Sequence, residues 1–535
     1  MWQQNYTPVA GSLALSALVA AIPIFVLLYM VGVKRKPAWI SSLLGLTAAM
    51  LVSGAVYGMP LGRLFSSVLM GAAFGLWPIG WVVFTAVLLY RVTLESGRFD
   101  LLKDSIAHLS DDKRLQVLLI AFAFGAFIEG AAGFATPVAV AATMLVGLGF
   151  SPFYAAGICL LANTAPVAFG SLAIPITTLA VTTGLPVDRL SAGVGRICAP
   201  VSLFIPAYLI WVMSGWKGLK AIFPAAAVCG VAFAVTQFLM SNFVSPQLTD
   251  ILSSIAAMGG VVLLTRFWRP SDVPETERGR LPHKTPHLLQ AWGPYILLVI
   301  FVLLWGYKPM SVWLNSKNVL VNWPGLHNTI ERMPPVVARP SPYAAVYNFN
   351  WLSAAGTSCL FAAILGSLVA GMAPMQFVKT IGHTFKQMAL ALLTLAAVLG
   401  IAYVMNYSGS TATLGLAFAA TGAAFPFFSA LLGWVGVFLT GSDTSANALF
   451  GTLQTVTANR LNMNEILMAS ANSAGGVMGK MVSLTSVAIA AAATSLKRED
   501  ESLLFRFTIR HSVFLACVIG VVVLFYAYVA PGLAP

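Results

Sequence analysis

Four ionisable residues stand inside long apolar stretches of this 535-residue chain: Glu129, Asp443, Arg196 and Lys480. A charge inside a membrane-length apolar stretch is costly, so each of these residues predicts a functional site. Desolvation raises the pKa of a carboxyl group, which lets a buried acid bind and release a proton near neutral pH. We therefore predict Asp443 as the first proton-coupling group and Glu129 as the second. Capping of a half-helix N-terminus is the alternative role for both carboxylates.

The two cations differ in how strongly they point to a site. Lys480 ends the segment GGVMGK, and a fixed cation near a helix break suits an anionic substrate. A salt bridge from Lys480 to Asp443 is its alternative role. Arg196 lies only a few residues inside its apolar run, so its side chain can also extend along the membrane to the outer surface.

Small polar residues gather around these charges, and they predict a site for a small organic anion. Half-helix N-termini offer free N–H groups to an anion, and hydroxyl and amide groups can bind a carboxylate or a hydroxyl. For any single residue, a hydrogen bond to the local backbone is the alternative. The predicted substrate-binding residues are Gly133, Thr136, Asn163, Thr164, Ser171, Thr444, Ser445, Asn472, Ser473 and Lys480.

These residues lie in two halves of the chain that resemble each other. FIEGAAGFATP (127–137) matches FLTGSDTSANA (438–448), and LLANTAPVAFG (160–170) matches MASANSAGGVMG (468–479). From the pair Pro60 and Pro374 to the pair Asn163 and Asn472, the offset falls steadily from 314 to 309 residues. Duplicated segments with interrupted helices are typical of secondary transporters whose site lies at the bilayer midplane.

The composition places the chain in a membrane. It is 59% hydrophobic and 9% charged, whereas a soluble globular protein carries about 25% charged residues. The net charge of +13 comes from basic residues in loops, which orient the spans and do not indicate nucleic acid. No metal-ligand spacing, phosphate-binding loop or cysteine pair is found, so we expect no cofactor and no direct use of ATP.

Apolar runs of about 20 residues predict about twelve transmembrane helices. Two further runs, 115–148 and 425–458, are broken in the middle by Gly and small polar residues, and we predict re-entrant hairpins there. The alternation of basic loops places both termini outside. The predicted spans are 11–33, 39–58, 64–91, 152–182, 191–213, 218–240, 247–266, 291–307, 345–370, 387–406, 464–495 and 511–531.

The spans and hairpins predict an all-α polytopic protein built on an inverted repeat, because an odd number of crossings separates the two copies. The alternative is that the Gly-rich stretches are ordinary helix-packing surfaces. The predicted parts are N-terminal helices 1–59; a first repeat 60–185 with hairpin 115–148 and broken helix 152–182; connecting scaffold helices 186–373 with a cytoplasmic loop 267–290 and an outer loop 308–343; a second repeat 374–497 with hairpin 425–458 and broken helix 464–495; and a C-terminal helix 498–535.

Several long segments resemble the bacterial lactate permease family over essentially the whole chain. They include WQQNYTP, GLWPIGWVVFTAVLLYRVTLESGRFD, FGAFIEGAAGFATPVAVAATMLVGLGF, VMNYSGSTATLGLA and TGSDTSANALFG. The resemblance implies proton-coupled uptake of L-lactate, and also of D-lactate and glycolate, across the bacterial inner membrane. It also implies an elevator-type motion by analogy. The expected partners are a small monocarboxylate, a proton and the lipid bilayer, with no nucleic acid, and an oligomer stays open.

Two other functions stay open at this point. The first is a sodium-coupled or dicarboxylate transporter of the same architecture, although a dicarboxylate favours more than one fixed cation. The second, more remote, is a membrane enzyme. The six histidines of this chain lie in loops or at span ends, and no nucleophile is paired with a base. The sequence therefore argues against an enzyme.

Overall fold

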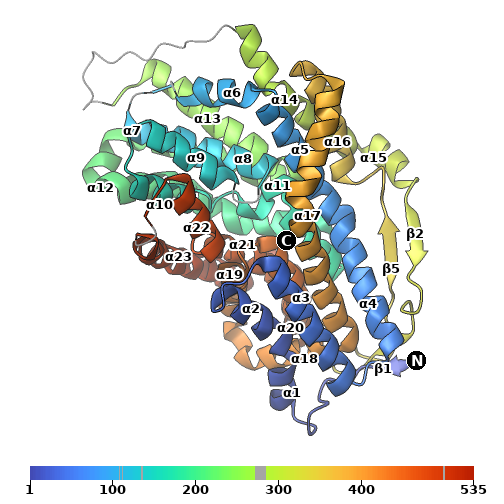
Figure 1. The fold of residues 1–535 in the computed structure, drawn as a ribbon. Helices are drawn as coiled ribbons and strands as arrows, with labels where there is room; N and C mark the ends of the chain where they lie inside the picture. The colour runs from blue at the N-terminus through green and yellow to red at the C-terminus, as the bar shows by residue number, and fades with distance from the viewer. Residues whose placement is uncertain (108, 111, 134–135, 271–284, 498–499, 535) are drawn as a thin grey trace.

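The computed structural model describes residues 1–107, 109–110, 112–133, 136–270, 285–497 and 500–534. Helices dominate and pack into one bundle, with short strands at its edge (Figure 1). Within the described residues, ten helices are long and apolar enough to cross a membrane, or up to twelve if each of two bent pairs is one span. The predicted fold class, an all-α polytopic membrane protein, is confirmed.

The N-terminal part and the first half of the chain contain helices only, apart from one short strand. They are β1 (Trp2–Gln3), α1 (Leu13–Ala20), α2 (Ile22–Gly32), α3 (Ala38–Leu51), η1 (Val52–Val56), α4 (Leu61–Phe74), η2 (Gly75–Gly80), α5 (Trp81–Glu95), α6 (Arg98–Ala107), α7 (Lys113–Gln116), η3 (Val117–Phe124), α8 (Gly125–Ala131), α9 (Thr136–Gly147), α10 (Pro152–Ala162), η4 (Val167–Phe169) and α11 (Gly170–Thr183).

The middle of the chain combines long helices with the remaining strands, and the second half returns to helices. The middle elements are α12 (Val187–Phe243), η5 (Pro246–Leu248), α13 (Thr249–Phe267), α14 (Thr285–Gly306), α15 (Lys308–Asn315), β2 (Val319–Asn322), β3 (Ile330–Arg332), β4 (Ser341–Pro342), β5 (Val346–Phe349) and α16 (Ala355–Val369). The later elements are α17 (Pro374–Ser408), α18 (Ser410–Phe418), η6 (Ala419–Ala424), α19 (Phe425–Thr440), α20 (Asp443–Arg460), α21 (Glu465–Lys480), α22 (Leu484–Ala493), α23 (Glu501–Leu524), η7 (Phe525–Val529) and η8 (Pro531–Leu533).

Each predicted hairpin region folds as two helices that pack against each other. In 115–148, α8 ends at Ala131, α9 begins at Thr136, and α9 packs back on η3 and α8. In 425–458, α19 ends at a left-handed Gly441 with φ +75°, and α20 begins two residues later and packs on α19. The second helix of each pair therefore starts at the tip of its hairpin.

The two predicted broken helices differ in how sharply they break. The first pair, 152–162 and 167–183, is bent by 66°. The backbone is left-handed at three consecutive non-glycine residues, with φ between 47° and 59° at Ser171, Leu172 and Ala173. In the second broken helix, only residues 481–483 separate α21 from α22. The two helices together are long and apolar enough to form one candidate membrane span.

The second hairpin and the second broken helix pack at backbone distance. A Cβ atom added at Gly475 on α21 would lie 1.9 Å from the carbonyl oxygen of Ala430 on α19. One added at Gly433 would lie 1.8 Å from the carbonyl oxygen of Asn472. Glycines here allow a closer helix approach than any other residue, as at small-residue interfaces in membranes.

Two predicted spans differ in detail from the structure. The run 64–91 is interrupted at Trp77, whose φ of −141° and ψ of 124° are not helical. The spans predicted at 191–213 and 218–240 both lie in α12, which turns between them at Gly215, with φ +66° and ψ −171°. The run 345–370 begins as strand β5, and its helix starts only at Ala355, because a short apolar segment does not distinguish strand from helix.

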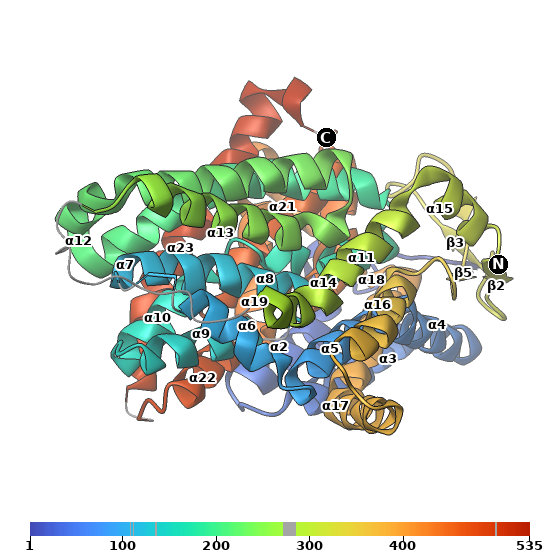
Figure 2. The ribbon, with the colours of Figure 1, turned by 90° about the horizontal axis from the view of Figure 1, so that it is seen from above.

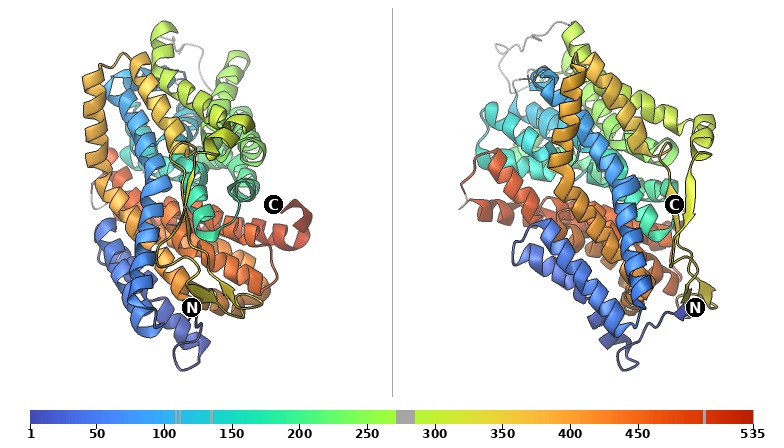
Figure 3. Two further views of the ribbon diagram at one scale, coloured as in Figure 1. Left: turned by 90° about the vertical axis from the view of Figure 1, so that its right-hand side faces the viewer. Right: turned by 45° about the vertical axis from the view of Figure 1, so that its right-hand side comes forward.

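The short strands tie the N-terminus to the segment between α15 and α16. Strand β1 pairs in parallel with β3, β3 pairs with β4, and β2 pairs antiparallel with β5. Gln4 Nε2 then donates to the carbonyl oxygens of Asn406 and Tyr407, at 2.9 Å each, at the end of α17. Figure 3 shows these strands along one edge of the bundle, with the N-terminus beside them.

Two groups of long helices frame the hairpins. Seen from above, α12 and α13 run side by side along one edge of the bundle (Figure 2). On another side, α17 packs along α4 and α5. The hairpins and broken helices lie between these layers, and most of the cytoplasmic loop predicted at 267–290 falls outside the described residues.

Candidate functional site

A cavity of about 90 Å³ lies between residues of the two halves. Glu129 and Ser171 line it from the first half, and Asp443, Thr444 and Lys480 line it from the second. Two structural features make room for it: the left-handed stretch of α11 on one side and the N-terminus of α20 on the other. The structure thus brings together two carboxylates, one cation and two hydroxyls that the sequence predicted as site residues.

Asp443 sits in a hydrogen-bonded half-site on α20. It is 3% exposed, and Ser473 Oγ donates to Asp443 Oδ2 at 2.6 Å. Asn447 Nδ2 is shared between Asp443 Oδ2 at 3.4 Å and Ser473 Oγ at 3.1 Å. The other carboxylate oxygen, Oδ1, has no hydrogen-bond partner in the described part of the chain, and it lies against Gly476. One oxygen is therefore held in place and the other is available.

Asn447 is the centre of this half-site, and the sequence analysis did not single it out. Its Nδ2 also donates to the carbonyl oxygen of Pro175 on α11 at 3.1 Å, which connects the two halves. Asn472 Nδ2 donates to Asn447 Oδ1 at 2.9 Å, and Gln454 Nε2 donates to Asn472 Oδ1 at 3.0 Å. The available signal was spacing, because Asn447 follows Asp443 by one helical turn and shares its face.

Lys480 supports the tip of the second hairpin. Its Nζ donates to the carbonyl oxygen of Gly441 at 2.7 Å, at the end of α19. Among the described residues it forms no ion pair with Asp443 or with Glu129, so the salt bridge considered from the sequence is not formed. Lys480 is nevertheless near enough for its charge to interact with both carboxylates.

Glu129 sits in a half-site with few hydrogen bonds. It is 4% exposed, and its carboxylate lies against Gly170, where an added Cβ would be 2.6 Å from Oε1. Glu129 Oε2 has no partner among the residues that the structure describes. Asn163 lies close to this carboxylate without hydrogen-bond geometry, and neither of its amide atoms has a partner there.

Ser171 joins the first hairpin to the first broken helix. Its Oγ donates to the carbonyl oxygen of Ala132 at 2.8 Å. At the hairpin tip, Gly133 has φ +60°, and a Cβ there would lie 1.9 Å from Ser171 Oγ. The tip therefore needs glycine at this position, both for its backbone conformation and for the close approach of Ser171.

The remaining predicted residues do not line the cavity. Thr164 Oγ1 donates to the carbonyl oxygen of Leu161 at 2.7 Å, which is the local bond considered as its alternative role. Thr136 begins α9, and the backbone N–H of Ser445 donates to Oγ of the N-cap residue Ser442 at 3.2 Å. Arg196 lies away from the cavity, where it donates to Asn242 Oδ1 at 2.8 Å and to the carbonyl oxygen of Leu533 at 2.7 Å.

A further buried ionisable residue, Asp250, was missed in the sequence. It lies in the first turn of α13, is 0% exposed, and packs against Gly130, the residue after Glu129. An acid inside an apolar span was a possible signal, since Asp250 falls inside the predicted span 247–266. It was missed because an acid so near the start of a span normally reaches the membrane surface.

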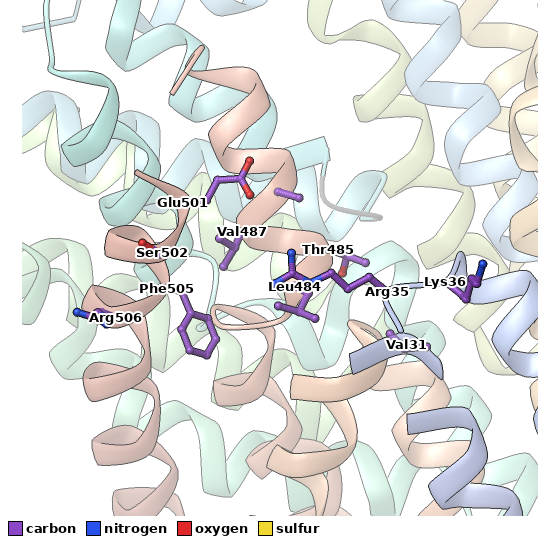
Figure 4. Close-up of a pocket in the computed structure, with 11 residues that line it drawn as sticks. Val31, Arg35, Lys36, Leu484, Thr485, Val487, Glu501, Ser502, Phe505 and Arg506 are labelled. Atoms are coloured by element: carbon purple, nitrogen blue, oxygen red, sulfur yellow. The ribbon is translucent and has the colours of Figure 1, made fainter. Parts of the chain in front are cut away.

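A larger cavity of about 660 Å³ lies elsewhere, between the loop after α2 and the helices α22 and α23. Figure 4 shows Arg35 extending toward Leu484 and Thr485, with Phe505 and Arg506 on the opposite side. None of the predicted site residues lines it. We assign the candidate site to the smaller cavity, because that one joins charged and polar groups from both halves.

Comparison with known proteins gives one consistent result. A family described as L-lactate permease matches residues 16–530. The chain is 42% identical to L-lactate permeases of Salmonella typhimurium and of Bacillus subtilis, over 100% of each chain. It is also 42% identical to the glycolate permease GlcA of Escherichia coli, over 99% of each chain.

Solved structures give a weaker likeness. The transporter MtrF of Neisseria gonorrhoeae aligns with a TM-score of 0.49 and 11% identity, over 94% of this chain and 97% of that one. The YdaH transporter of Alcanivorax borkumensis aligns with a TM-score of 0.46 and 16% identity, over 89% of this chain and 90% of that one.

Proposed function

The chain belongs to the L-lactate permease family, and from this premise we propose that it takes up L-lactate, D-lactate and glycolate together with a proton. The family consists of permeases, so the remote reading as a membrane enzyme is set aside. The observation that carries the proposal is the cavity in which Glu129, Asp443 and Lys480 meet.

The lining of this cavity suits a small 2-hydroxy acid. Lys480 Nζ and the free N–H groups at the N-terminus of α20 are positioned to attract a carboxylate. The hydroxyls of Ser171 and Thr444 are available in the same cavity for the substrate hydroxyl. Lys480 is the one cation among the described lining residues, which favours a monocarboxylate over a dicarboxylate.

We assign proton coupling first to Asp443. Its Oδ2 is fixed by Ser473 and Asn447, while Oδ1 is free to take a proton. A monocarboxylate carries one negative charge, so one proton per substrate makes the step neutral. Asp443 would bind a proton in one half of the cycle and release it in the other, and Glu129 is the second candidate.

The proposed setting is the bacterial inner membrane, with both termini outside and the two repeats inverted relative to each other. Support comes from the basic loops, which alternate along the chain, and from the matching order of hairpin and broken helix in each half. Reporter fusions at each terminus test the orientation. A reporter active in the cytoplasm at either end would contradict it.

The decisive experiment is uptake of labelled L-lactate by the purified chain in proteoliposomes. An inwardly directed proton gradient alone should drive accumulation, and a protonophore should abolish it. A sodium gradient alone should drive none. Accumulation with sodium and without a pH difference would establish the sodium-coupled alternative, and strong competition by a four-carbon dicarboxylate would establish the dicarboxylate one.

A further inference from the structure

Behind the first hairpin lies a group of buried polar atoms without partners, drawn from four parts of the chain. Glu129 on α8, Asn163 after α10, Gln237 on α12 and Asp250 on α13 together contribute six such atoms, counted among the described residues: one carboxylate oxygen of Glu129, both amide atoms of Asn163, Gln237 Oε1 and both oxygens of Asp250. Buried polar atoms in folded proteins are nearly always hydrogen-bonded, so this concentration requires an explanation.

The contacts place these residues as neighbours. Gln237 Nε2 donates to the carbonyl oxygen of Ala165 at 3.2 Å, two residues after Asn163. Asn163 lies close to Glu129. A Cβ added at Gly130 would lie 2.8 Å from Asp250 Cβ, so Asp250 packs against the backbone next to Glu129. The group therefore continues from the cavity toward α12 and α13.

Asp250 has no counter-charge in this group. Among the described residues, the titratable groups near it are Glu129 on α8 and Cys198 on α12. The η3 segment that also packs on α13 is VLLIAFAF and carries no charge. Within the residues that the structure describes, no salt bridge joins Asp250 to Lys480 or to another cation.

A first-turn acid is usually stabilised by its own helix N-terminus and by water. Asp250 is completely buried, and neither of its oxygens accepts a hydrogen bond in the described part of the chain. An isolated ionised carboxylate in such a place is too costly, and two neighbouring carboxylates do not both stay ionised. A proton on Asp250 removes both difficulties, because Asp250 is then neutral and the remaining charge is on Glu129, which lies near Lys480.

We propose that Asp250 is a second proton-binding group of the transporter, which exchanges a proton with Glu129 across Gly130. The proton moves from one carboxyl oxygen to the other, so one acid gains the O–H bond that the other loses, and the total charge of the pair is unchanged. The unpartnered amide atoms of Asn163 and Gln237 would hold the water through which the proton moves. The proposal rests on the proton coupling proposed above.

The test compares Asp250→Asn with Asp188→Asn in the full chain. Asp188 lies in the first turn of α12 but is exposed, so it is a control matched in residue type and helix position. We expect Asp250→Asn to lose accumulation of lactate driven by a pH gradient, while counterflow exchange persists. Asp188→Asn should behave as the wild type. Wild-type accumulation in Asp250→Asn would overturn the proposal.

A second measurement covers the case in which Asp250→Asn abolishes all transport. Infrared difference spectra of the protein in lipid nanodiscs, recorded while the pH is lowered, report buried carboxyl groups as they take up protons. The wild type and Asp188→Asn should show a band that Asp250→Asn lacks. Glu129→Gln should keep that band but change the pH at which it appears, because the neighbouring carboxyl group is gone.

The outcomes separate this proposal from the proposed function. An identical set of carboxyl bands in wild type and Asp250→Asn would overturn the role of Asp250, whatever the transport result. A wild-type protein that does not accumulate lactate under a pH gradient would contradict proton symport instead. In that case a band that depends on Asp250 and Glu129 would still establish the carboxyl pair.

Discussion

The two half-sites around the cavity are built from matching segments, but they differ in how their polar atoms are used. In the second half, Asn472 accepts from Gln454 and donates to Asn447. Its counterpart by sequence in the first half, Asn163, has no partner for either amide atom among the described residues. The two matching asparagines therefore differ in their surroundings, and only Asn472 is part of a hydrogen-bonded network.

The difference separates a rigid part of the site from an open one. A fully bonded buried network fixes side chains in one arrangement. An unbonded group of buried polar atoms is complete only when water, a proton or a substrate joins it. We therefore regard the amide network around Asp443 as the part that fixes the geometry of the site, and the Glu129 half-site as the part whose hydrogen bonds are completed during transport.

The largest expected effect comes from removing the charge in the rigid half. Asp443→Asn should abolish accumulation of lactate driven by a pH gradient, because the proton site is lost, while counterflow exchange remains in part. Uptake and counterflow by the same proteoliposomes measure the two activities. Glu129→Gln is the companion variant. If both variants still accumulate lactate under a pH difference alone, neither acid is the obligatory proton site.

The second prediction concerns the centre of the rigid half. Asn447→Ala removes the donor to Asp443, Ser473 and the Pro175 carbonyl and the acceptor for Asn472, and it should destabilise the protein by about 3 kcal/mol. The measurement is the unfolding of the purified protein in detergent. Asn459→Ala, at an exposed position of the same helix α20, is the matched control and should change stability little. Equal stability of the two variants would refute a network centred on Asn447.

The third prediction isolates the cation. Lys480→Gln removes the charge that faces the cavity, and it should weaken lactate binding by about 10- to 100-fold, the usual contribution of a charged hydrogen bond. Arg196→Gln should leave the affinity near that of the wild type, since Arg196 binds Asn242 and Leu533 away from the cavity. The concentration dependence of counterflow gives both affinities. A larger loss in Arg196→Gln would place the anion elsewhere.

The smallest effect is the sharpest test of the comparison. Asn472→Ala should lower the free energy of unfolding by about 1–3 kcal/mol and leave lactate affinity nearly unchanged. Asn163→Ala should change the stability little, because neither of its amide atoms has a hydrogen-bond partner to lose among the described residues. Both are measured on the same preparations. Equivalent behaviour of the two variants would show that the half-sites have not diverged.

The interruptions of the apolar runs could be predicted because glycine, proline and small polar residues stand where an uninterrupted helix would carry large apolar ones. The hairpin tip at Gly133 and the turn at Gly441 follow from that pattern. The break at Trp77 was not predicted, although GLWPIG contains Gly75, Pro78 and Gly80, because it has no small polar residue and transmembrane helices tolerate proline and glycine.

Partners across the sequence could not be predicted from the chain alone. Asp443 and Lys480 were recognised by type, but the bond from Asn447 to Pro175 joins residues 272 positions apart. Asp250 was overlooked because an acid near the start of a span is usually at the membrane surface. Its complete burial depends on how α13 packs against α8, which one sequence does not reveal.

The pairing of the first residues of the chain has a consequence for the order of assembly. Strand β1 finds its partner in β3, and Gln4 finds its partners at Asn406 and Tyr407. During synthesis β1 therefore stays unpaired until β3 has left the ribosome, and Gln4 stays unpaired until Asn406 and Tyr407 have left it. Completion of these pairings is a late step in biogenesis, because it requires that the helices between the paired residues have already been made and placed.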